Sequence, residues 1–325
     1  MGLSKICRSI KKYNNFLIAA HTSPEGDALG AQLGFYNIIK KLGKQATIVS
    51  DDRLPYGYDF LPGAKIIRRL DKESAYIKFD CLVVLDCADL KRTGRVYELN
   101  HDNKPVLNID HHISNQSFGD VNWVDARASS CSEMIYKLHK RLHLAMDRDT
   151  ALVLYTGIMT DTGSFRYSNT SSSTFRAAAE LLKFGINVAQ VYRYTYENIP
   201  PAEAKLLLKF LSKIKFFADG RLAVFQIDQK ITKAKTSGVD LADQCLTFGR
   251  TIKGVEVVAL FKKNLGPKFQ VRVNLRSQGA VDVNKVAAFF GGGGHRTAAG
   301  CTVSGNLLSV RRKVISKICQ VFNQK

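Results

Sequence analysis

Four carboxylates and two histidines in the first half of the chain stand where apolar segments end. Asp86, for example, directly follows the apolar run Cys81–Leu85. Oxygen ligands mixed with imidazole, with no cysteine among them, favour Mn²⁺ or Mg²⁺ over structural zinc. A pair of such ions about 3.5–4 Å apart promotes the attack of water on phosphorus, and one carboxylate must bridge the pair. Asp86 is well placed to do so, and the candidate ligands are His21, Glu25, Asp27, Asp86, His111 and Asp161.

Each of these side chains also has an ordinary structural alternative. His21 fits a hydrogen-bonded loop residue, and Glu25 fits a solvated turn residue. Asp27 precedes an apolar stripe and fits a helix N-cap, whereas Asp161 fits an Asx-turn residue in the segment TDTG. A charged group directly after a buried strand has a weaker structural explanation, and this applies to Asp86 and Asp110. Because carboxylates and imidazoles recur at the ends of several predicted strands and helices, chance is a poor explanation and we predict a metal site.

A glycine tetrad precedes His295 in the C-terminal part of the chain. Such a run lets the backbone approach a ligand and present N–H groups to an anion, although it also fits a flexible hairpin. Arg276 and Ser277 end a basic segment with the sequence FQVRVNLRS. Because arginine offers a bidentate fork to phosphate, the two features together predict a phosphate clamp.

The elements that must position these groups follow from hydrophobic patterning. Apolar runs typical of buried strands alternate with amphipathic patterns, so we predict an α/β fold whose parallel sheet carries helices on both faces. In such sheets functional groups gather beyond the carboxyl ends of the strands. The predicted strands are Asn15–Ala20, Ala46–Val49, Cys81–Leu85 and Val106–Ile109, and the predicted helices are Asp27–Leu42, Ser130–Leu142, Thr150–Met159 and Thr174–Phe184.

A second, smaller αβ module is predicted in the last third of the chain. Pro200–Pro201 and the lysine-rich helix Ala202–Ile214 form a connector. We therefore expect a catalytic domain over residues 1–190, a helical linker over 191–215 and a substrate-binding domain over 216–325. The predicted strands of the second module are Leu222–Ile227, Glu256–Phe261 and Phe269–Leu275, and its helices are Asp240–Phe248, Asp282–Phe290 and Leu307–Phe322.

Charge is distributed unequally between the two modules. The chain carries a net charge of +20, and residues 201–325 hold 22 Lys and Arg against 7 Asp and Glu. This module therefore suits phosphate-bearing ligands, with a solvated basic surface as the alternative.

The overall composition and the cysteines indicate what class of protein this is and where it is located. A content of 45% hydrophobic and 23% charged residues is typical of a folded globular chain. No run approaches the roughly 18–20 apolar residues of a membrane span, and the N-terminus lacks a secretory signal. Because the seven cysteines are scattered and include no CxxC, we expect reduced thiols, a cytoplasmic location and no membrane partner.

These residues resemble the motifs of the DHH phosphoesterases. Asp110-His111-His112 matches the DHH signature. The match runs in order from about residue 15 to about residue 305, and within this superfamily the chain resembles NrnA-type bifunctional enzymes, oligoribonucleases (nanoRNases) that also hydrolyse 3′-phosphoadenosine 5′-phosphate (pAp). The other matching segments are HTSPEGDALGA (His21–Ala31), VVLDCAD (Val83–Asp89) and TDTGSFRYSNT (Thr160–Thr170), and FGGGGHRTAAG (Phe290–Gly300) resembles the DHH-associated C-terminal domain.

The resemblance implies a phosphoesterase whose site lies in a cleft between the two domains and holds two divalent ions. We expect these ions to be Mn²⁺, with Mg²⁺ as the alternative. The chain departs from the usual motif at Glu25, where an Asp is typical, and at Ala31, where a Ser is typical. Glutamate adds one methylene and can still ligate after a small shift. By motif, one ion is expected at His21, Glu25 and Asp86, and the other at Asp27, Asp86, His111 and Asp161, with Asp86 shared.

The resemblance also assigns roles outside the metal ligands. Asp110 is expected to orient an imidazole, and His112 is expected to face the scissile phosphate as a charge stabiliser or a leaving-group acid. The substrate's phosphate and terminal nucleotide are expected to contact Arg276, Ser277, Gly292, Gly293, Gly294 and His295.

The expected substrates are short RNA oligonucleotides, hydrolysed to mononucleotides, and pAp, hydrolysed to AMP. One alternative is a phosphodiesterase that acts on cyclic or linear dinucleotides with the same catalytic centre. A single-strand DNA exonuclease of the RecJ kind would need a further nucleic-acid-binding domain. A non-catalytic RNA-binding module would use the basic C-terminal part, but such a module has no need for so many carboxylates. A homodimer is a further expectation, with apolar helices such as Thr150–Met159 as its candidate interface.

Overall fold

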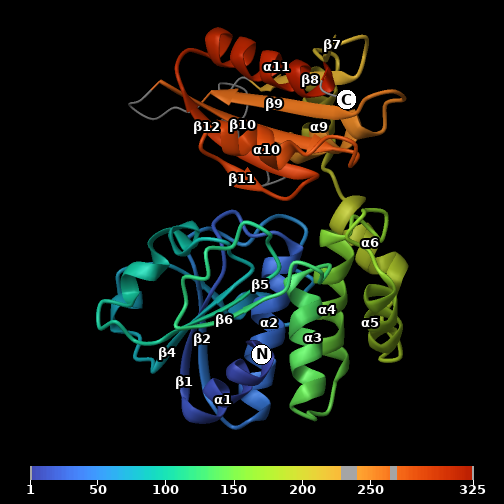
Figure 1. Ribbon diagram of the computed structural model, residues 1–325. Helices are drawn as coiled ribbons and strands as arrows, with labels where there is room; N and C mark the ends of the chain where they lie inside the picture. The colour runs from blue at the N-terminus through green and yellow to red at the C-terminus, as the bar shows by residue number, and fades with distance from the viewer. Residues whose placement is uncertain (1, 228–239, 264–268, 324–325) are drawn as a thin grey trace. The chain divides into compact units, whose positions relative to one another are not determined.

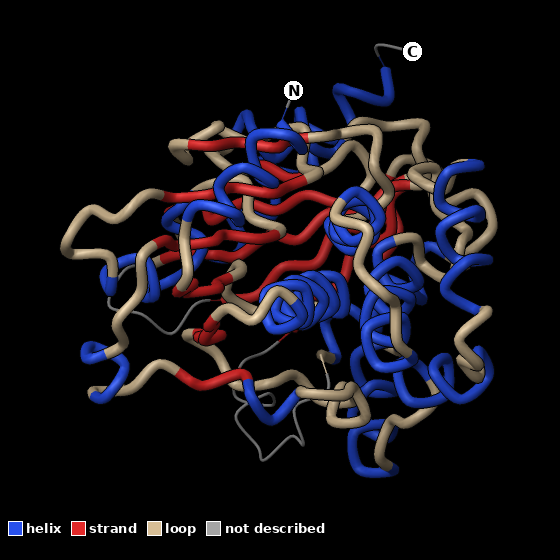
Figure 2. The backbone as a smooth tube through the Cα atoms, turned by 90° about the horizontal axis from the view of Figure 1, so that it is seen from below, coloured by secondary structure: helices blue, strands red, loops and turns tan. Residues whose placement is uncertain are grey.

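The computed structural model describes residues 2–227, 240–263 and 269–323, and the chain divides into two compact units (Figure 1). Unit 1 is Met1–Asn198 and unit 2 is Ile199–Lys325. Each unit contains one six-stranded sheet, and its strands run side by side as a layer (Figure 2). No helix in the described ranges is both long and apolar enough to cross a membrane.

The sheet of unit 1 is parallel throughout, with the strand order β3-β2-β1-β4-β5-β6. This is the order of the doubly wound dinucleotide-binding folds, in which the direction of winding reverses between β1 and β4 and ligands bind beyond the carboxyl ends at that point. The central strands β4 and β5 are buried on both faces, which explains their continuous apolar runs. The strands are β1 (Asn15–Ala19), β2 (Gln45–Ser50), β3 (Ile67–Arg69), β4 (Cys81–Leu85), β5 (Val106–Asp110) and β6 (Val121–Val124).

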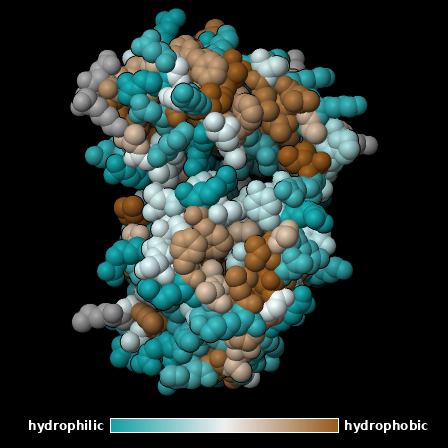
Figure 3. All heavy atoms as spheres, turned by 90° about the vertical axis from the view of Figure 1, so that its right-hand side faces the viewer, coloured by the Kyte–Doolittle hydropathy of each residue, from teal (hydrophilic) through white to brown (hydrophobic). Residues whose placement is uncertain are grey.

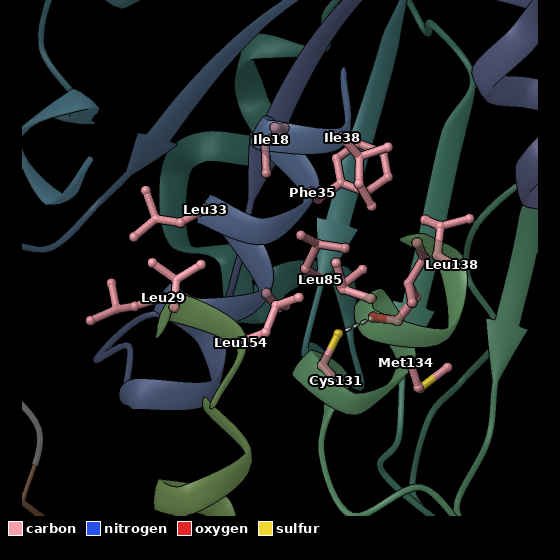
Figure 4. Packing of buried hydrophobic residues seen from close by; sticks show 14 of the residues in the cluster. Ile18, Leu29, Leu33, Phe35, Ile38, Leu85, Cys131, Met134, Leu138 and Leu154 are labelled. Carbon is pink, nitrogen blue, oxygen red and sulfur yellow. Dashed lines mark hydrogen bonds between the residues drawn. The ribbon is translucent and has the colours of Figure 1, made fainter. Parts of the chain in front are cut away.

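Helices cover one face of this sheet and form the main core of unit 1. Side chains of α2, α3 and α4 meet those of the strands there, including Leu33, Leu85, Met134 and Leu154 (Figure 4). The helices of unit 1 are α1 (Gly2–Lys12), α2 (Gly26–Lys41), α3 (Cys131–Arg141), α4 (Arg148–Asp161), α5 (Ser172–Leu182) and α6 (Val188–Tyr196).

The opposite face of the sheet differs from the prediction of helices on both faces. Its smaller core takes Leu17, Val49 and Leu82 from the strands, and Val96 of the 3₁₀ segment η3 (Leu90–Leu99) together with loop side chains covers them. The segments on this side form 3₁₀ turns in place of α-helices, with η2 (Glu73–Tyr76) next to Ile77 of this smaller core. A third 3₁₀ turn, η1 (Ala64–Ile66), contributes Ala64 to the main core instead.

Helix α4 extends the predicted helix Thr150–Met159 at both ends, and its apolar side chains are committed to the core. Val153, Leu154, Ile158 and Met159 are all buried. This helix is therefore unavailable as a dimer interface, and that interpretation of its apolar pattern is wrong.

Unit 2 contains a mixed sheet in the order β11-β12-β10-β9-β8-β7, antiparallel except between β8 and β9. One face packs on α10 and α11, and α7 and α9 cover β8 and β9 on the other. The strands are β7 (Lys215–Phe217), β8 (Leu222–Ile227), β9 (Val257–Lys263), β10 (Gln270–Ser277), β11 (Gly293–Gly294) and β12 (Ala298–Ser304), and the helices are α7 (Pro201–Leu211), α9 (Leu241–Arg250), α10 (Val283–Phe289) and α11 (Leu307–Asn323).

Candidate active site

The carboxyl ends of β1, β4 and β5 bring together residues that are far apart in the sequence. His21 follows β1, Asp86 follows β4, and Asp110 ends β5 with His111 directly after it. The Nε2 atom of His21 lies 3.4 Å from Oδ2 of Asp86, and Nε2 of His111 lies 3.5 Å from Oδ1 of the same carboxylate. Asp86 therefore lies between two imidazoles at the point where the winding of the sheet reverses.

The backbone of Asp86 is held in an unusual conformation. Its φ of +52° lies in the left-handed region, where a non-glycine residue is uncommon. The backbone N–H of Asp86 donates to the carbonyl of Ile109 on the neighbouring strand at 3.0 Å, which fixes this turn. Burial alone raises the pKa of the Asp86 carboxyl, but the imidazoles of His111 and His21 outweigh this effect and hold the pKa well below its ordinary value. The carboxylate is therefore ionised at neutral pH.

Two further carboxylates reach the same place from helices. Oδ2 of Asp27, in the first turn of α2, lies 3.8 Å from Nε2 of His111, and Oδ2 of Asp161, the last residue of α4, lies 3.6 Å from that atom. Burial raises the pKa of Asp27 well above its ordinary value, and the charges of Asp86 and Asp161 raise it further. A cation at this place would relieve the repulsion among the three carboxylates.

Asp27 does not cap its own helix, so the N-cap interpretation of this residue is wrong. Helix α2 begins at Gly26 with Glu25 as its N-cap residue. The carboxylate of Asp27 instead accepts hydrogen bonds from the backbone N–H groups of Cys131 (2.7 Å) and Ser132 (2.8 Å) in the first turn of α3. The positive end of the α3 dipole thus holds a candidate ligand in place.

Contacts behind the imidazoles orient their rings. Nδ1 of His21 lies 2.8 Å from the carbonyl oxygen of Thr22, and Nδ1 of His111 lies 3.4 Å from that of Ala128. These contacts direct Nε2 of each ring toward the carboxylates. Nδ1 of His112 instead lies 2.7 Å from Oδ1 of Asp110, which is fully buried. Asp110 is therefore in a position to orient the imidazole of His112.

Three asparagines support the site, and sequence reasoning missed all of them. The side-chain amide of Asn115 donates to Oδ2 of Asp110 at 2.6 Å and to Oδ1 of the buried Asn108 at 2.9 Å. The amide of Asn169 donates to the backbone carbonyl of Asp161 at 3.1 Å and to its Oδ2 at 3.3 Å. Asparagine in a loop is also typical of an ordinary turn, so only the positions of Asn115 after the DHH segment and of Asn169 after the TDTG segment could have drawn attention to them. Asn108 lies inside β5 before the DHH segment and gave no such signal.

The donor set fits a divalent cation. Ligand atoms of Asp27, Asp86 and His111 lie within 4.8 Å of one another, as do those of Asp86, Asp110 and His112, and all five residues are buried. The separations of 3.5–3.8 Å around Nε2 of His111 exceed an ordinary hydrogen bond. Carboxylate oxygens with imidazole nitrogen are ligands suited to Mn²⁺ and Mg²⁺.

The predicted phosphate-binding residues all lie in unit 2. Nη2 of Arg276 pairs with Oδ1 of Asp243 at 3.2 Å. Ser277 is fully buried, and its hydroxyl donates to the carbonyl of Val281 at 2.7 Å, so this side chain closes a turn. The backbone N–H of His295 donates to the carbonyl of Ala298 at 2.7 Å.

The glycine tetrad is part of the sheet, where Gly293 and Gly294 form β11 against β12. A Cβ at Gly292 would overlap the carbonyl oxygen of Gly300, and one at Gly294 would lie 2.5 Å from that of Ala298. Packing on β12 therefore requires glycine at these two positions. A Cβ at Gly293 meets only Asn284, at 3.8 Å, so its backbone lies in more open space.

Glu133 joins the N-termini of α3 and α5 behind the site, and it provides a test of the local packing. It is almost fully buried and accepts from Ser129 Oγ at 2.6 Å, Ser173 Oγ at 2.7 Å and Lys137 Nζ at 2.7 Å. Burial raises the pKa of Glu133, but these hydrogen bonds outweigh it and lower the pKa to about 2. Its stabilisation is thus complete above the unfolded pKa of 4.5 and is lost as the pH falls toward about 2.

Replacing Glu133 with Gln is expected to lower the free energy of unfolding at pH 7 by about 2 kcal/mol. The amide removes the negative charge, and its NH₂ group is a donor placed beside side chains that themselves donate hydrogen bonds to this position. Urea unfolding at pH 7, 5 and 4 should show this difference shrinking as the pH falls. Glu180→Gln is the matched control, since Glu180 pairs with Lys183 on the surface, and this substitution should cost less than about 0.5 kcal/mol. A Glu133→Gln difference that is the same at pH 4 and pH 7 would contradict the assignment.

Comparison with known proteins agrees with the fold. Residues 15–158 match the DHH family, N-terminal domain, and residues 219–324 match the DHHA1 domain. The chain is 34% identical over 289 residues to the bifunctional oligoribonuclease and PAP phosphatase NrnA of Thermus thermophilus, covering 89% of this chain and 84% of the relative. It is 31% identical to the probable NrnA of Streptococcus mutans and 27% identical to the NrnA of Bacillus subtilis, over 91% and 92% of this chain and 91% and 93% of those relatives.

A solved structure shares the fold of the whole chain. It is an exopolyphosphatase-related protein from Bacteroides fragilis, which superposes with a TM-score of 0.84 at 24% identity over 99% of this chain and 96% of that one. With a DHH core, a DHHA1 domain and a buried carboxylate–histidine cluster at the switch point, the chain belongs to the DHH family of phosphoesterases. It is accordingly a hydrolase that acts on phosphoester bonds.

Proposed function

We propose that this protein hydrolyses short RNA oligonucleotides to mononucleotides and removes one phosphate from pAp to give AMP. The single observation that carries the proposal is the convergence of Asp27, Asp86 and Asp161 on Nε2 of His111 in a buried cluster. The names of relatives at 27–34% identity supply the substrates. Mn²⁺ as the resident ion and a cytoplasmic location belong to the same proposal.

The metal ligands divide into two sets that share one residue. When bound, the two ions would activate the attacking water and offset the negative charge on the phosphate. The shared position suits Asp86, because its two carboxylate oxygens face different imidazoles. Glu25 stands at the N-cap of α2, at the start of the same helix as Asp27. One set is His21, Glu25 and Asp86, and the other is Asp27, Asp86, His111 and Asp161.

The remaining residues of the site act on the substrate. Asp110 holds His112 through Nδ1. We assign to this imidazole one of two roles, either stabilising the negative charge on the scissile phosphate or donating a proton to the leaving oxygen. The phosphate and terminal nucleotide of the substrate are assigned to unit 2, at Arg276, Ser277, Gly292, Gly293, Gly294 and His295. Because Ser277 is buried and bonded to Val281, its contribution would be to hold the turn beside Arg276.

A homodimer completes the proposal. Apolar side chains gather on the side of the molecule on which α5 and α6 lie, as the lower part of Figure 3 shows. Phe175, Val188 and Tyr192 are exposed there, and this surface replaces α4 as the candidate interface.

Product analysis with purified protein and Mn²⁺ tests the substrate assignment. A labelled RNA dinucleotide, a long RNA of about 24 nucleotides and pAp are compared, with chelator-treated protein as the control. We expect the dinucleotide to be cleaved faster than the long RNA and pAp to release AMP. Both activities should be lost in the chelator-treated protein. Preference for the long RNA would instead indicate a processive exonuclease. No cleavage of RNA or pAp would refute the proposal and make cyclic dinucleotides the next substrates to test.

A further inference from the structure

One face of the unit 2 sheet presents two arginines from a single strand. Side chains of a strand alternate between its two faces, and in β10 Val271, Val273 and Leu275 point into the core beneath α10 and α11. Arg272 and Arg276 therefore project from the opposite face. Arg272 is exposed, whereas Arg276 is half-buried.

The neighbouring strand β12 offers small residues to this same face. Thr302, Gly300 and Ala298 pair with Arg272, Asn274 and Arg276. Neither apolar core of unit 2 includes a side chain from this face of β10 and β12 among the described residues. On this face, β12 thus offers only small residues beside the two arginines of β10.

The two arginines are directed to opposite sides of their strand. Nη1 of Arg272 lies 3.4 Å from Oγ1 of Thr302, and its Nη2 lies 3.1 Å from where a Cβ of Gly300 would stand, so the guanidinium rests across β12. Gly300 in turn pairs with Gly293 of β11. Arg276 instead pairs with Asp243 of α9. Four residues of strand separate their Cα atoms by about 13 Å, so a single phosphate cannot engage both.

Asn274 lies on this face between the two arginines. Its Oδ1 atom is buried and has no hydrogen-bond partner among the described residues. An unsatisfied acceptor in a half-buried position is costly, and a hydroxyl or amino donor of a ribose or base would satisfy it. The observation is independent of the charges and also indicates a ligand on this surface.

We propose that Arg272 binds a second phosphate of an oligonucleotide whose terminal phosphate lies at Arg276, and so determines the preference for substrate length. The inference rests on the proposed function, because it takes single-stranded RNA as the ligand. pAp also carries two phosphates, but one of them is the group that is hydrolysed, so pAp places a single phosphate on this surface, at the Arg276 end. An oligonucleotide extends over Asn274 and Gly300 and gains the contact with Arg272.

Binding to metal-free protein tests this without turnover. The affinity of labelled pAp and of a labelled RNA tetranucleotide is measured by fluorescence anisotropy over a range of salt concentrations. Arg272→Gln is expected to weaken tetranucleotide binding by about tenfold and to reduce the slope of log K against log salt by about 0.7, the value for one phosphate contact of a single strand. Binding of pAp should not change.

Arg312→Gln is the matched control, because it removes the same charge from α11, which packs on the opposite face of the sheet. Equal effects of the two variants on the tetranucleotide, or a loss of pAp binding in Arg272→Gln, would overturn the inference. If the protein binds the tetranucleotide with the expected change in slope but cleaves no RNA, the proposed function fails and the assignment of Arg272 stands. If the protein cleaves RNA but Arg272→Gln binds the tetranucleotide as tightly as Arg312→Gln does, the proposed function stands and the assignment of Arg272 fails.

Discussion

Replacing Asp86 with Asn is expected to reduce hydrolysis of the RNA dinucleotide and of pAp by at least about 10³-fold, because the shared carboxylate of a two-ion centre is lost. Asn tolerates the left-handed backbone of Asp86, whereas Ala at a φ of +52° would add strain. Asn therefore removes the charge with little change to the turn. Initial rates at saturating Mn²⁺ measure the effect, and circular dichroism confirms that the variant is folded.

Asp89→Asn is the control for this prediction. Asp89 lies three residues further along the chain, where it caps η3 by accepting from the N–H of Lys91. This variant should retain turnover close to that of the unchanged protein. Near-normal activity of Asp86→Asn in Mn²⁺ would refute the two-ion centre, because no other residue contacts both His21 and His111 through its two oxygens in the described part of the site.

Replacing Gly157 with Ala is expected to weaken Mn²⁺ binding by about 10- to 100-fold, the range for groups that orient metal ligands. Gly157 lies on α4 where α2 and the start of α3 approach it. A Cβ at this position would overlap Oγ of Ser132, lie 2.7 Å from Cβ of Ser132 and lie 3.0 Å from Oδ1 of Asp27. Since the N–H of Ser132 holds the Asp27 carboxylate, displacing Ser132 moves the ligand.

Two further variants separate this effect from a general loss of packing. Gly34→Ala on α2 places its Cβ against Cδ2 of Leu154 on α4, away from Asp27. It should cost about 1–3 kcal/mol of unfolding free energy and leave Mn²⁺ affinity unchanged. Adding Ser132→Gly to Gly157→Ala removes the overlapping atoms and keeps the backbone N–H, so calorimetric titration should show affinity returning. If Gly157→Ala is destabilised but binds Mn²⁺ normally, the glycine serves packing alone.

Much of the fold could be predicted because its central strands are continuous apolar runs and its helices keep a clear apolar period. The elements that were missed lack such a signal. Helix α1 buries only Ile6 and Ile10 of a lysine-rich segment. The edge strands β3 and β6 are three and four residues long and largely half-exposed or exposed. Their pairing depends on neighbours distant in sequence, which local patterning cannot reveal.

The candidate ligands could be predicted because each follows an apolar element, and parallel topology brings such ends together. The partners that orient them could not be predicted in the same way. Asp27 is held by backbone N–H groups more than 100 residues further along the chain. Nothing in the local sequence of α2 indicates that its carboxylate serves α3, so the pattern was equally consistent with an ordinary N-cap.

This arrangement at Asp27 makes the site a product of long-range assembly. His21 and Asp161 are 140 residues apart in the sequence, and the carboxylate between them is fixed only once α3 has docked beside α2. An unfolded or half-folded chain therefore presents its ligands one at a time and binds an ion weakly. By mass action, an ion that binds only the assembled site would stabilise the folded chain, so the free ion concentration would contribute to how much of the chain is folded.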